Sequence, residues 1–201
     1  FVTRAFKDIG DELLINPTLF LASTSPRRRE LLQQIGLSFE VLRVDVDEST
    51  QVNELPEAYV QRLSLAKAQM GLTQCPNDAL VLAADTTVVI DNHIIGKPES
   101  LEQAITIWQS LSGRCHQVLT GVTLAIVVTT DVYFCPLSLQ EMQTYWETGE
   151  PQDKAGGYGI QGKGALFVEK IDGSYSNVVG LPLTETAQLL RLFGMRFNFN
   201  Q

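Results

Sequence analysis

The sequence predicts an α/β protein in which a mixed, twisted sheet is flanked by helices. Strand-like and helix-like segments alternate along the 201 residues, as they do in α/β domains. Turn signals that join neighbouring strands as hairpins recur at residues 91–92 and 172–173, and hairpins argue against a purely parallel sheet. Hydrophobic residues make up 44% of the chain and charged residues 19%, a composition that is typical of a protein with a packed core.

Local signals place the individual elements. Strands are expected at residues 18–23, 38–46, 79–90, 94–95 and 118–134, and helices at residues 26–36, 56–70, 100–113, 138–149 and 182–194. Ser25, Ser100 and Ser138 are the expected N-caps, because a serine side chain can accept a hydrogen bond from a free N–H group of the helix. Gln103 is expected to complete a capping box with Ser100, and Glu141 to cap the helix at residues 138–149 together with Ser138.

The chain divides into a short N-terminal extension and one domain. Residues 1–15 contain acidic side chains and no long apolar stretch, unlike a secretory signal. We expect them to be an extension, natural or added, ahead of the first strand. Residues 16–201 are expected to form a single domain of two lobes around a cleft.

Between residues 125 and 131 a strand-rich stretch shows no obvious turn, so we expect a loop to be missing from the sequence there.

Charge and composition disfavour several classes of function. With 23 acidic and 15 basic side chains the net charge is −8, whereas non-specific nucleic-acid binders usually carry a basic excess. No apolar run approaches the roughly 20 residues that span a bilayer. Cys75, Cys115 and Cys135 are odd in number and far apart, which favours reduced thiols in a cytoplasmic protein. An acidic protein can still bind a polyanion if its few cations converge and a divalent ion screens the phosphates.

The segment from Leu21 to Leu32 is the first candidate site. A strand leads through a Ser/Thr-rich turn into a helix N-terminus, where unpaired N–H groups and the helix dipole favour an anion. Arg27, Arg28 and Arg29 occupy the first turn of this helix, although the dipole favours acidic residues there. Helical spacing directs Arg27 and Arg28 toward the sheet and Arg29 outward. We interpret the turn as a phosphate site; the alternative is a solvated basic turn paired with nearby acids.

Asp85 is the second candidate, because it interrupts a long apolar strand. A buried carboxylate needs a partner, since an uncompensated buried charge is costly. A metal ion, a lysine or an attacking water would each supply one; the alternative is a structural aspartate held by backbone amides or by Thr86 and Thr87. If residues 91–92 form a two-residue turn, Lys97 lies across from Thr86. A three-residue turn places it across from Thr87, and either register keeps its ammonium near Asp85.

Lys67 and a glycine-rich loop complete the candidates. Lys67 falls on the apolar face of its expected helix, so its side chain either extends to solvent or points into an anionic cleft. Residues 153–164 contain five glycines, a density that lets a loop approach a ligand closely. Tyr158, Ile160 and Gln161 lie among them and are suited to packing on a base and hydrogen bonding to it; a flexible surface loop is the alternative. The sequence contains no Walker A, His-metal, Gly-x-Ser-x-Gly or Cys-His signature.

These segments, in this order, resemble the Maf family of nucleoside triphosphate pyrophosphatases. The resemblance spans nearly everything from Leu19 to Phe193 and includes LASTSPRRRELL, VDVDE, AYVQRLSLAKA, AADTTVV, GKP, SGRCHQVLTGV, DKAGGYGIQG and GSYSNVVGLPL. It implies a deep-clefted fold related to the inosine triphosphate pyrophosphatases, a divalent cation such as Mg²⁺ or Mn²⁺, and a homodimer. The DKAGGYGIQG form is similar to the branch that acts on dTTP and UTP. The extension before Asn16 has no counterpart in the family.

The resemblance also implies roles for individual residues. It implies catalytic groups at Arg28, Lys67, Asp85 and Lys97, substrate contacts at Ser23, Arg27, Arg28 and Gln161, and metal ligands at Glu48 and Asp85. On this hypothesis the triphosphate lies across the N-terminus of the first helix, water attacks the α-phosphorus, and pyrophosphate leaves. Asp85 would position or deprotonate that water, and Gln161 would pair with a pyrimidine edge.

Two other functions stay open at the level of the sequence. A house-cleaning pyrophosphatase for non-standard purine nucleotides, such as ITP or XTP, would have a similar fold. A regulator, for instance of cell division, could bind a nucleotide without hydrolysing it. Rates for UTP, dTTP and ITP separate the first alternative, and release of pyrophosphate in the presence of Mg²⁺ excludes the second. No nucleic-acid or membrane partner is expected.

Overall fold

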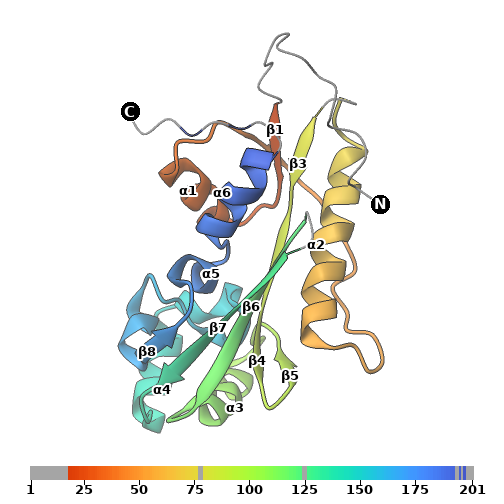
Figure 1. The fold of residues 1–201 in the computed structure, drawn as a ribbon. Coiled ribbons are helices and arrows are strands. Elements are labelled where there is room, and N and C mark those ends of the chain that lie inside the picture. Colours follow the sequence, from red (N-terminus) through yellow and green to blue (C-terminus); the bar gives the residue numbers. More distant parts are fainter. Residues whose placement is uncertain (1–17, 77–78, 124–125, 193–194, 196, 198–201) are drawn as a thin grey trace.

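The computed structural model describes residues 18–76, 79–123, 126–192, 195 and 197. Its helices lie against the two faces of a long, twisted β-structure (Figure 1). The helices are α1 (Pro26–Gln34), α2 (Pro56–Leu72), α3 (Leu101–Leu111), α4 (Leu139–Glu147), α5 (Tyr175–Val179) and α6 (Leu183–Leu192), with 3₁₀ turns η1 (Glu150–Asp153), η2 (Ala155–Gly157) and η3 (Lys163–Phe167). The strands are β1 (Leu19–Ala22), β2 (Glu40–Leu42), β3 (Leu80–Leu82), β4 (Ala84–Ile90), β5 (His93–Ile95), β6 (Cys115–Val122), β7 (Ile126–Phe134) and β8 (Val168–Asp172).

The strands form two sheets. Three parallel strands have the order β2-β1-β3, and five antiparallel strands have the order β5-β4-β6-β7-β8. Only Ala83 separates β3 from β4, so one stretch of chain passes from the first sheet into the second (Figure 1). The predicted α/β class with parallel and antiparallel pairing is confirmed. The strand expected at residues 79–90 is two strands, because its halves pair with different neighbours.

Alternation along β1 shows how the parallel sheet is covered on both faces. Leu19 and Leu21 belong to a buried cluster with residues of α1 and α6. Phe20 and Ala22 point the other way and pack with Ala68 of α2. Successive side chains of a strand point to opposite faces, and here both faces meet helices, which is why all four positions of β1 are apolar and buried.

The helix α2 also covers the antiparallel sheet at very close range. Val60 of α2 packs with residues of β4 and β6. Gly121 of β6 faces the helix, and a Cβ added to this glycine would overlap the backbone carbonyl of Val60. This close approach sets the distance between α2, which carries Lys67, and β4, which carries Asp85.

An aromatic cluster fills the opposite face of the antiparallel sheet. Trp108 of α3, Tyr145 of α4 and Phe167 of η3 pack together with Phe134 of β7. The Trp108 indole N–H also donates a hydrogen bond of 3.1 Å to the carbonyl of Gly157. The cluster therefore ties the start of the glycine-rich loop to the sheet.

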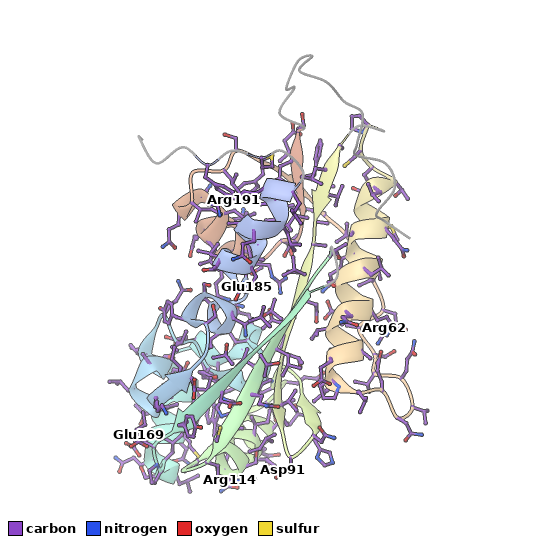
Figure 2. All side chains as sticks on the ribbon, viewed as in Figure 1. Arg62, Asp91, Arg114, Glu169, Glu185 and Arg191 are labelled. Atoms are coloured by element: carbon purple, nitrogen blue, oxygen red, sulfur yellow. The ribbon has the colours of Figure 1, made fainter. Side chains whose placement is uncertain are left out.

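The turn between β4 and β5 is the predicted two-residue hairpin. Asp91 and Asn92 have φ values of 48° and 65°, and Ile90 pairs with His93, as in a type I′ turn. Arg114 lies beside this turn (Figure 2) and donates to both carboxylate oxygens of Asp91 at 2.7 and 2.8 Å. The hairpin register that the sequence left open is thus the two-residue one.

The caps were predicted better than some of the strands. Ser100 and Ser138 accept hydrogen bonds from the backbone N–H of Gln103 and Glu141, as predicted. Glu141 completes a capping box, whereas the Gln103 side chain accepts from the N–H of Glu99 instead of Ser100. The Ser25 side chain caps no N–H group of α1. The strand expected at residues 38–46 is much shorter, since only β2 pairs with β1.

The structure corrects one expected turn and leaves one expected loop untested. No hairpin forms at residues 172–173, because Ser174 instead caps α5 by accepting from the N–H of Asn177. Residues 126–131 belong to β7, which pairs without interruption with β6. Val122 of β6 pairs with Ile126 of β7, and a missing loop between these strands stays a prediction because residues 124–125 lie outside the described part. Gly194, the expected end of the last helix, and the extension at 1–15 lie outside it as well.

Candidate active site

A cleft with a volume of about 930 Å³ opens beside the carboxyl end of β1 and the start of β4. Its walls come from the β1–α1 turn, α2, β4, the segment after β5 and the glycine-rich loop. All eight residues singled out from the sequence line this cleft: Ser23, Arg27, Arg28, Glu48, Lys67, Asp85, Lys97 and Gln161. The fold therefore gathers cations and acids from distant stretches of the chain in one hollow. The structure shows where these residues lie, and their roles stay predictions.

Lys67 connects two acidic residues of the cleft, Asp85 and Glu48. Its Nζ atom lies 2.5 Å from Oδ1 of Asp85 and 2.7 Å from Oε1 of Glu48. The side chains of Lys67 and Asp85 are 11% and 9% exposed, whereas that of Glu48 is 48% exposed. Of the two alternatives for Lys67, the one that points it into an anionic cleft is correct.

The two carboxyl groups differ in their affinity for a proton. Burial raises the pKa of Asp85, and the attraction of Lys67 and Arg28 offsets this only in part. Burial also acts to raise the pKa of Glu48, but the hydrogen bond from Lys67 and the charges of Lys67 and Lys97 outweigh it, so this pKa is lowered. Neighbouring carboxyl groups with pKa values moved in opposite directions are typical of acid–base sites. Asp85 is the better proton acceptor of the pair.

Arg28 is buried and rigidly held at the floor of the cleft. Its Nε atom donates to the carbonyl of Gly180 at 2.9 Å, Nη1 to Oγ of Ser23 at 3.1 Å, and Nη2 to Oγ1 of Thr86 at 3.0 Å. These bonds join α1, β4 and the segment after α5 through one guanidinium group. The sequence indicated Arg28 and Ser23, but it carried no signal for Gly180, which lies 152 residues away.

The other two cations predicted from the sequence, Arg27 and Lys97, lie nearer the mouth of the cleft. Arg27 forms an ion pair of 3.4 Å with Asp153, which links α1 to the glycine-rich loop. Lys97 is exposed and follows β5, so its side chain is not part of the β4–β5 ladder. Among the described residues it has no ion-pair partner within 4.0 Å. Its charge acts mainly on Glu48 rather than on Asp85, which refines the expectation that its ammonium lies near Asp85.

Two residues of α2 hold the segment that carries Glu48. The Tyr59 hydroxyl donates to the carbonyl of Glu48 at 3.0 Å. Arg62, which Figure 2 shows on α2, donates to the carbonyl of Ser49 at 2.9 Å and to both oxygens of the Glu54 carboxylate at 2.6 and 2.8 Å. Tyr59 and Arg62 were not predicted from the sequence to hold this segment. The available signal was the i, i+3 spacing of Tyr59 and Arg62 on one helix that follows an acidic segment.

The large residues of the glycine-rich loop have separate locations. Tyr158 lies at the wall of the cleft, but its hydroxyl forms a hydrogen bond of 2.9 Å with Nε2 of His116 in the buried core. The Tyr158 hydroxyl is therefore engaged by the core. Ile160 packs against the core next to α1 and α6. Gln161 is exposed and lines the cleft, so it is the residue of the three whose polar group is available to a ligand.

Glu48 and Asp85 are suited to a divalent cation. Both carboxylates contact the ammonium of Lys67, so two carboxylate oxygen donors lie close together. Among the residues that the structure describes, no group of three or more His, Cys, Asp or Glu side chains gathers. Mg²⁺ commonly binds to one or two carboxylates and completes its shell with water and substrate phosphates. The donor set present therefore fits Mg²⁺ better than a metal that requires a complete protein cage.

Together the fold and the cleft define an α/β protein with a pocket lined by side chains of both charges. Residues 18–193 match the family model described as Maf-like protein, and the chain belongs to this Maf family. The family predicted from the sequence is thus confirmed. None of the described helices is long and apolar enough to cross a membrane.

Several curated relatives match over most of their length. A dTTP/UTP pyrophosphatase of Vibrio parahaemolyticus is 50% identical over 183 residues, which cover 88% of this chain and 97% of the relative. A dTTP/UTP pyrophosphatase of Acinetobacter baylyi is 53% identical over 178 residues, which cover 85% of this chain and 97% of the relative. A protein of the same description in Pseudoalteromonas translucida is 53% identical over 182 residues, which cover 87% of this chain and 96% of the relative.

Proposed function

We propose that this protein hydrolyses dTTP and UTP to the nucleoside monophosphate and pyrophosphate. The observation that carries the proposal is the cluster of Lys67, Asp85 and Glu48 beside the arginine-rich N-terminus of α1, within one cleft. The relatives that share about half of the residues and nearly the full length bear the same description, which supports this choice of substrates.

The triphosphate would lie between α1 and the segment after β5. Arg27 and Lys97 provide charge near the mouth of the cleft, and both side chains have room to move toward an anion. Arg28 is already oriented by three bonds, so its remaining N–H groups can bind a phosphate oxygen with little loss of conformational entropy. The free N–H groups at the start of α1 add to the positive potential.

Hydrolysis requires a water molecule to attack the α-phosphorus while pyrophosphate leaves. Asp85 accepts a proton from that water, which its raised pKa favours, and Lys67 holds the Asp85 carboxylate in place. A divalent ion held by Glu48 and Asp85 would neutralise charge that develops on the phosphate oxygens. Arg28 and Lys97 add further positive charge that would stabilise the same oxygens.

The base would lie against the glycine-rich loop. Gln161 offers a donor and an acceptor on one side chain, and this pair matches the acceptor and donor on the edge of uracil or thymine. Backbone groups near Gly159 and Gly162 also line this part of the cleft. The pyrimidine preference therefore depends on how the loop presents Gln161.

We propose in addition that the protein acts in the cytoplasm as a homodimer. Its three cysteines are free, as expected in a reducing compartment. The dimer is the assembly that the family resemblance implies. Light scattering coupled to size-exclusion chromatography measures the mass directly, and a monomer at micromolar concentration would contradict this part of the proposal.

A substrate panel tests the proposed reaction. Pyrophosphate release is measured for UTP, dTTP and ITP, each with Mg²⁺ and with excess EDTA. We expect kcat/KM for UTP and dTTP to exceed that for ITP, and EDTA to abolish the activity. A preference for ITP would instead indicate a purine house-cleaning enzyme, and no release from any triphosphate would indicate a binding protein without turnover.

A further inference from the structure

Two residues outside the proposed catalytic groups hold the glycine-rich loop. The Tyr145 hydroxyl accepts a hydrogen bond of 3.1 Å from the N–H of Gly159 and donates one of 2.7 Å to Oε1 of Glu150. The Glu150 carboxylate also accepts from the N–H groups of Lys163 and Gly164 at 2.9 and 3.0 Å. We call these two residues the loop clamp. It holds the chain on both sides of residues 160–162.

The glycines of the loop are necessary for this contact. A Cβ added to Gly162 would overlap the Glu150 carboxylate. A Cβ added to Gly164 would lie 2.6 Å from the Tyr145 hydroxyl oxygen, closer than real Cβ atoms approach. Neither glycine has a positive φ, so the close approach, and not an unusual backbone conformation, explains why glycine is present. At these two positions the glycines make room for the clamp.

The clamp is rigid, charged and adjacent to the cleft. Tyr145 is buried in the aromatic cluster with Trp108 and Phe167, so its hydroxyl has a fixed position. Burial acts to raise the pKa of Glu150, but the hydrogen bonds from Tyr145, Gly164 and Lys163 outweigh it and the pKa is lowered. Glu150 is therefore ionised at neutral pH and accepts strong, charge-assisted bonds. Glu150 also lines the cleft on the side of Gln161.

We infer that Tyr145 and Glu150 are positioning residues that fix residues 160–162, and with them Gln161, for recognition of the base. This inference rests on the proposed function, because it assigns the glycine-rich loop to the base and the cations of α1 to the phosphates. Loss of the clamp would let the loop sample other conformations, so that the nucleotide must order it on binding. Affinity for a ligand with a base would fall, while affinity for a bare polyphosphate would not.

The variants Glu150→Gln and Tyr145→Phe test this selectivity. Glutamine retains the shape of the side chain but removes its charge and places an amide N–H₂ group toward the N–H donors of the loop. Phenylalanine retains the aromatic packing and removes only the bridging hydroxyl. The matched controls are Glu147→Gln, at the exposed end of α4, and Tyr175→Phe, on the exposed side of α5.

Two dissociation constants are measured by calorimetry, for a non-hydrolysable α,β-imido analogue of UTP and for inorganic tripolyphosphate. We expect Kd for the analogue to rise about tenfold in Glu150→Gln and roughly threefold in Tyr145→Phe, as for the loss of one or two hydrogen bonds. Kd for tripolyphosphate should stay within about twofold, and both controls should match the wild type. Hydrogen exchange of the ligand-free loop should be faster in both clamp variants.

An unchanged Kd for the analogue, or an equal loss of affinity for both ligands, would overturn the inference. If Glu150→Gln does not fold, Tyr145→Phe decides the question alone. The proposed function is judged separately, by pyrophosphate release from the wild-type protein. Because the imido analogue is not hydrolysed, its binding still tests the clamp when the wild type shows no turnover, and failure of the wild type to bind it would overturn the clamp as well.

Discussion

Lys67 and Asp85 form an ion pair of 2.5 Å in which the side chains are 11% and 9% exposed. The pair joins α2 to β4 at the floor of the cleft. Lys67 also bonds to Glu48, so its charge stays compensated if the Asp85 carboxylate is neutralised. Substitutions at Asp85 can therefore separate chemistry from folding.

The variant Asp85→Asn should lose turnover and retain nucleotide binding. Asparagine has a similar shape but accepts no proton from water, and loss of general base catalysis typically costs about 10²–10⁴-fold in rate. We expect at least this loss in kcat for UTP, with Kd for the non-hydrolysable analogue changed by less than about threefold. Normal hydrolysis by this variant would show that Asp85 has been assigned wrongly.

The same variant should be at least as stable as the wild type at pH 7. Burial raises the pKa of Asp85 in the folded state, so the folded protein binds this proton more tightly than the unfolded chain, whose aspartate has a pKa of about 3.9. The stabilising contribution is present below that value and is lost as the pH rises through the folded pKa. Urea unfolding of both proteins at pH 7 and pH 4 measures it; a clear destabilisation of Asp85→Asn at pH 7 contradicts it.

Replacement of Arg62 by methionine should weaken both catalysis and stability. The bond from Arg62 to the Ser49 carbonyl and the pair with Glu54 hold the segment that carries Glu48. The Arg62 side chain is 28% exposed but that of Glu54 only 6%, so the variant leaves a buried carboxylate without its partner, and we expect the free energy of unfolding to fall by about 1–3 kcal/mol. The ratio kcat/KM should fall roughly tenfold, since about 1.4 kcal/mol of positioning is lost.

Arg29→Met is the matched control for that experiment. Arg29 is exposed on α1, and its side chain has no ion-pair partner in the described part of the chain. Its replacement should leave kcat/KM unchanged. Equal kinetics for the Arg62 and Arg29 variants would mean that the segment around Glu48 does not depend on Arg62.

The variant Gly121→Ala should destabilise the fold by roughly 1–3 kcal/mol, as overpacking usually does. The added methyl group would overlap the backbone of Val60, and α2 would have to move away from the sheet. Gly96→Ala is the control, because an added Cβ meets nothing within 4 Å there. Urea unfolding compares the two, and similar free energies of unfolding would show that α2 can shift without cost.

His116 should make the protein sensitive to mild acid. Burial lowers its pKa to about 4, whereas an unfolded histidine titrates near pH 6.5. The unfolded chain therefore binds the proton more tightly, and stability present above pH 6.5 is lost as the pH falls toward 4. One titrating proton changes the free energy of unfolding by at most about 1.4 kcal/mol per pH unit. The variant His116→Gln should lose this component in urea unfolding between pH 7 and 4.5, and parallel curves would contradict it.

Local signals predicted several features whose determining contacts are local. The caps at Ser100 and Ser138 and the turn at residues 91–92 depend on groups within a few residues, and these predictions are confirmed. The hairpin predicted at residues 172–173 was wrong because its signal was also only local. An Asp-Gly pair indicates a turn, but it does not indicate whether a strand or a helix follows. The helix α5 has only 5 residues, which is too short to show helical periodicity in the sequence.

The sequence by itself determined which chemical groups the protein has and the local secondary structure that carries each of them. These are a charged helix start after a buried strand, an acid within an apolar strand, and a loop dense in glycine. Only the tertiary structure decided which of them meet. Arg27 reaches Asp153 across 126 residues and Arg28 reaches Gly180 across 152. Hydrogen bonds and ion pairs act over a few ångströms, so partners so far apart in the chain are chosen by the packing of helices on sheets, such as the contact of Val60 with Gly121, which no local pattern records.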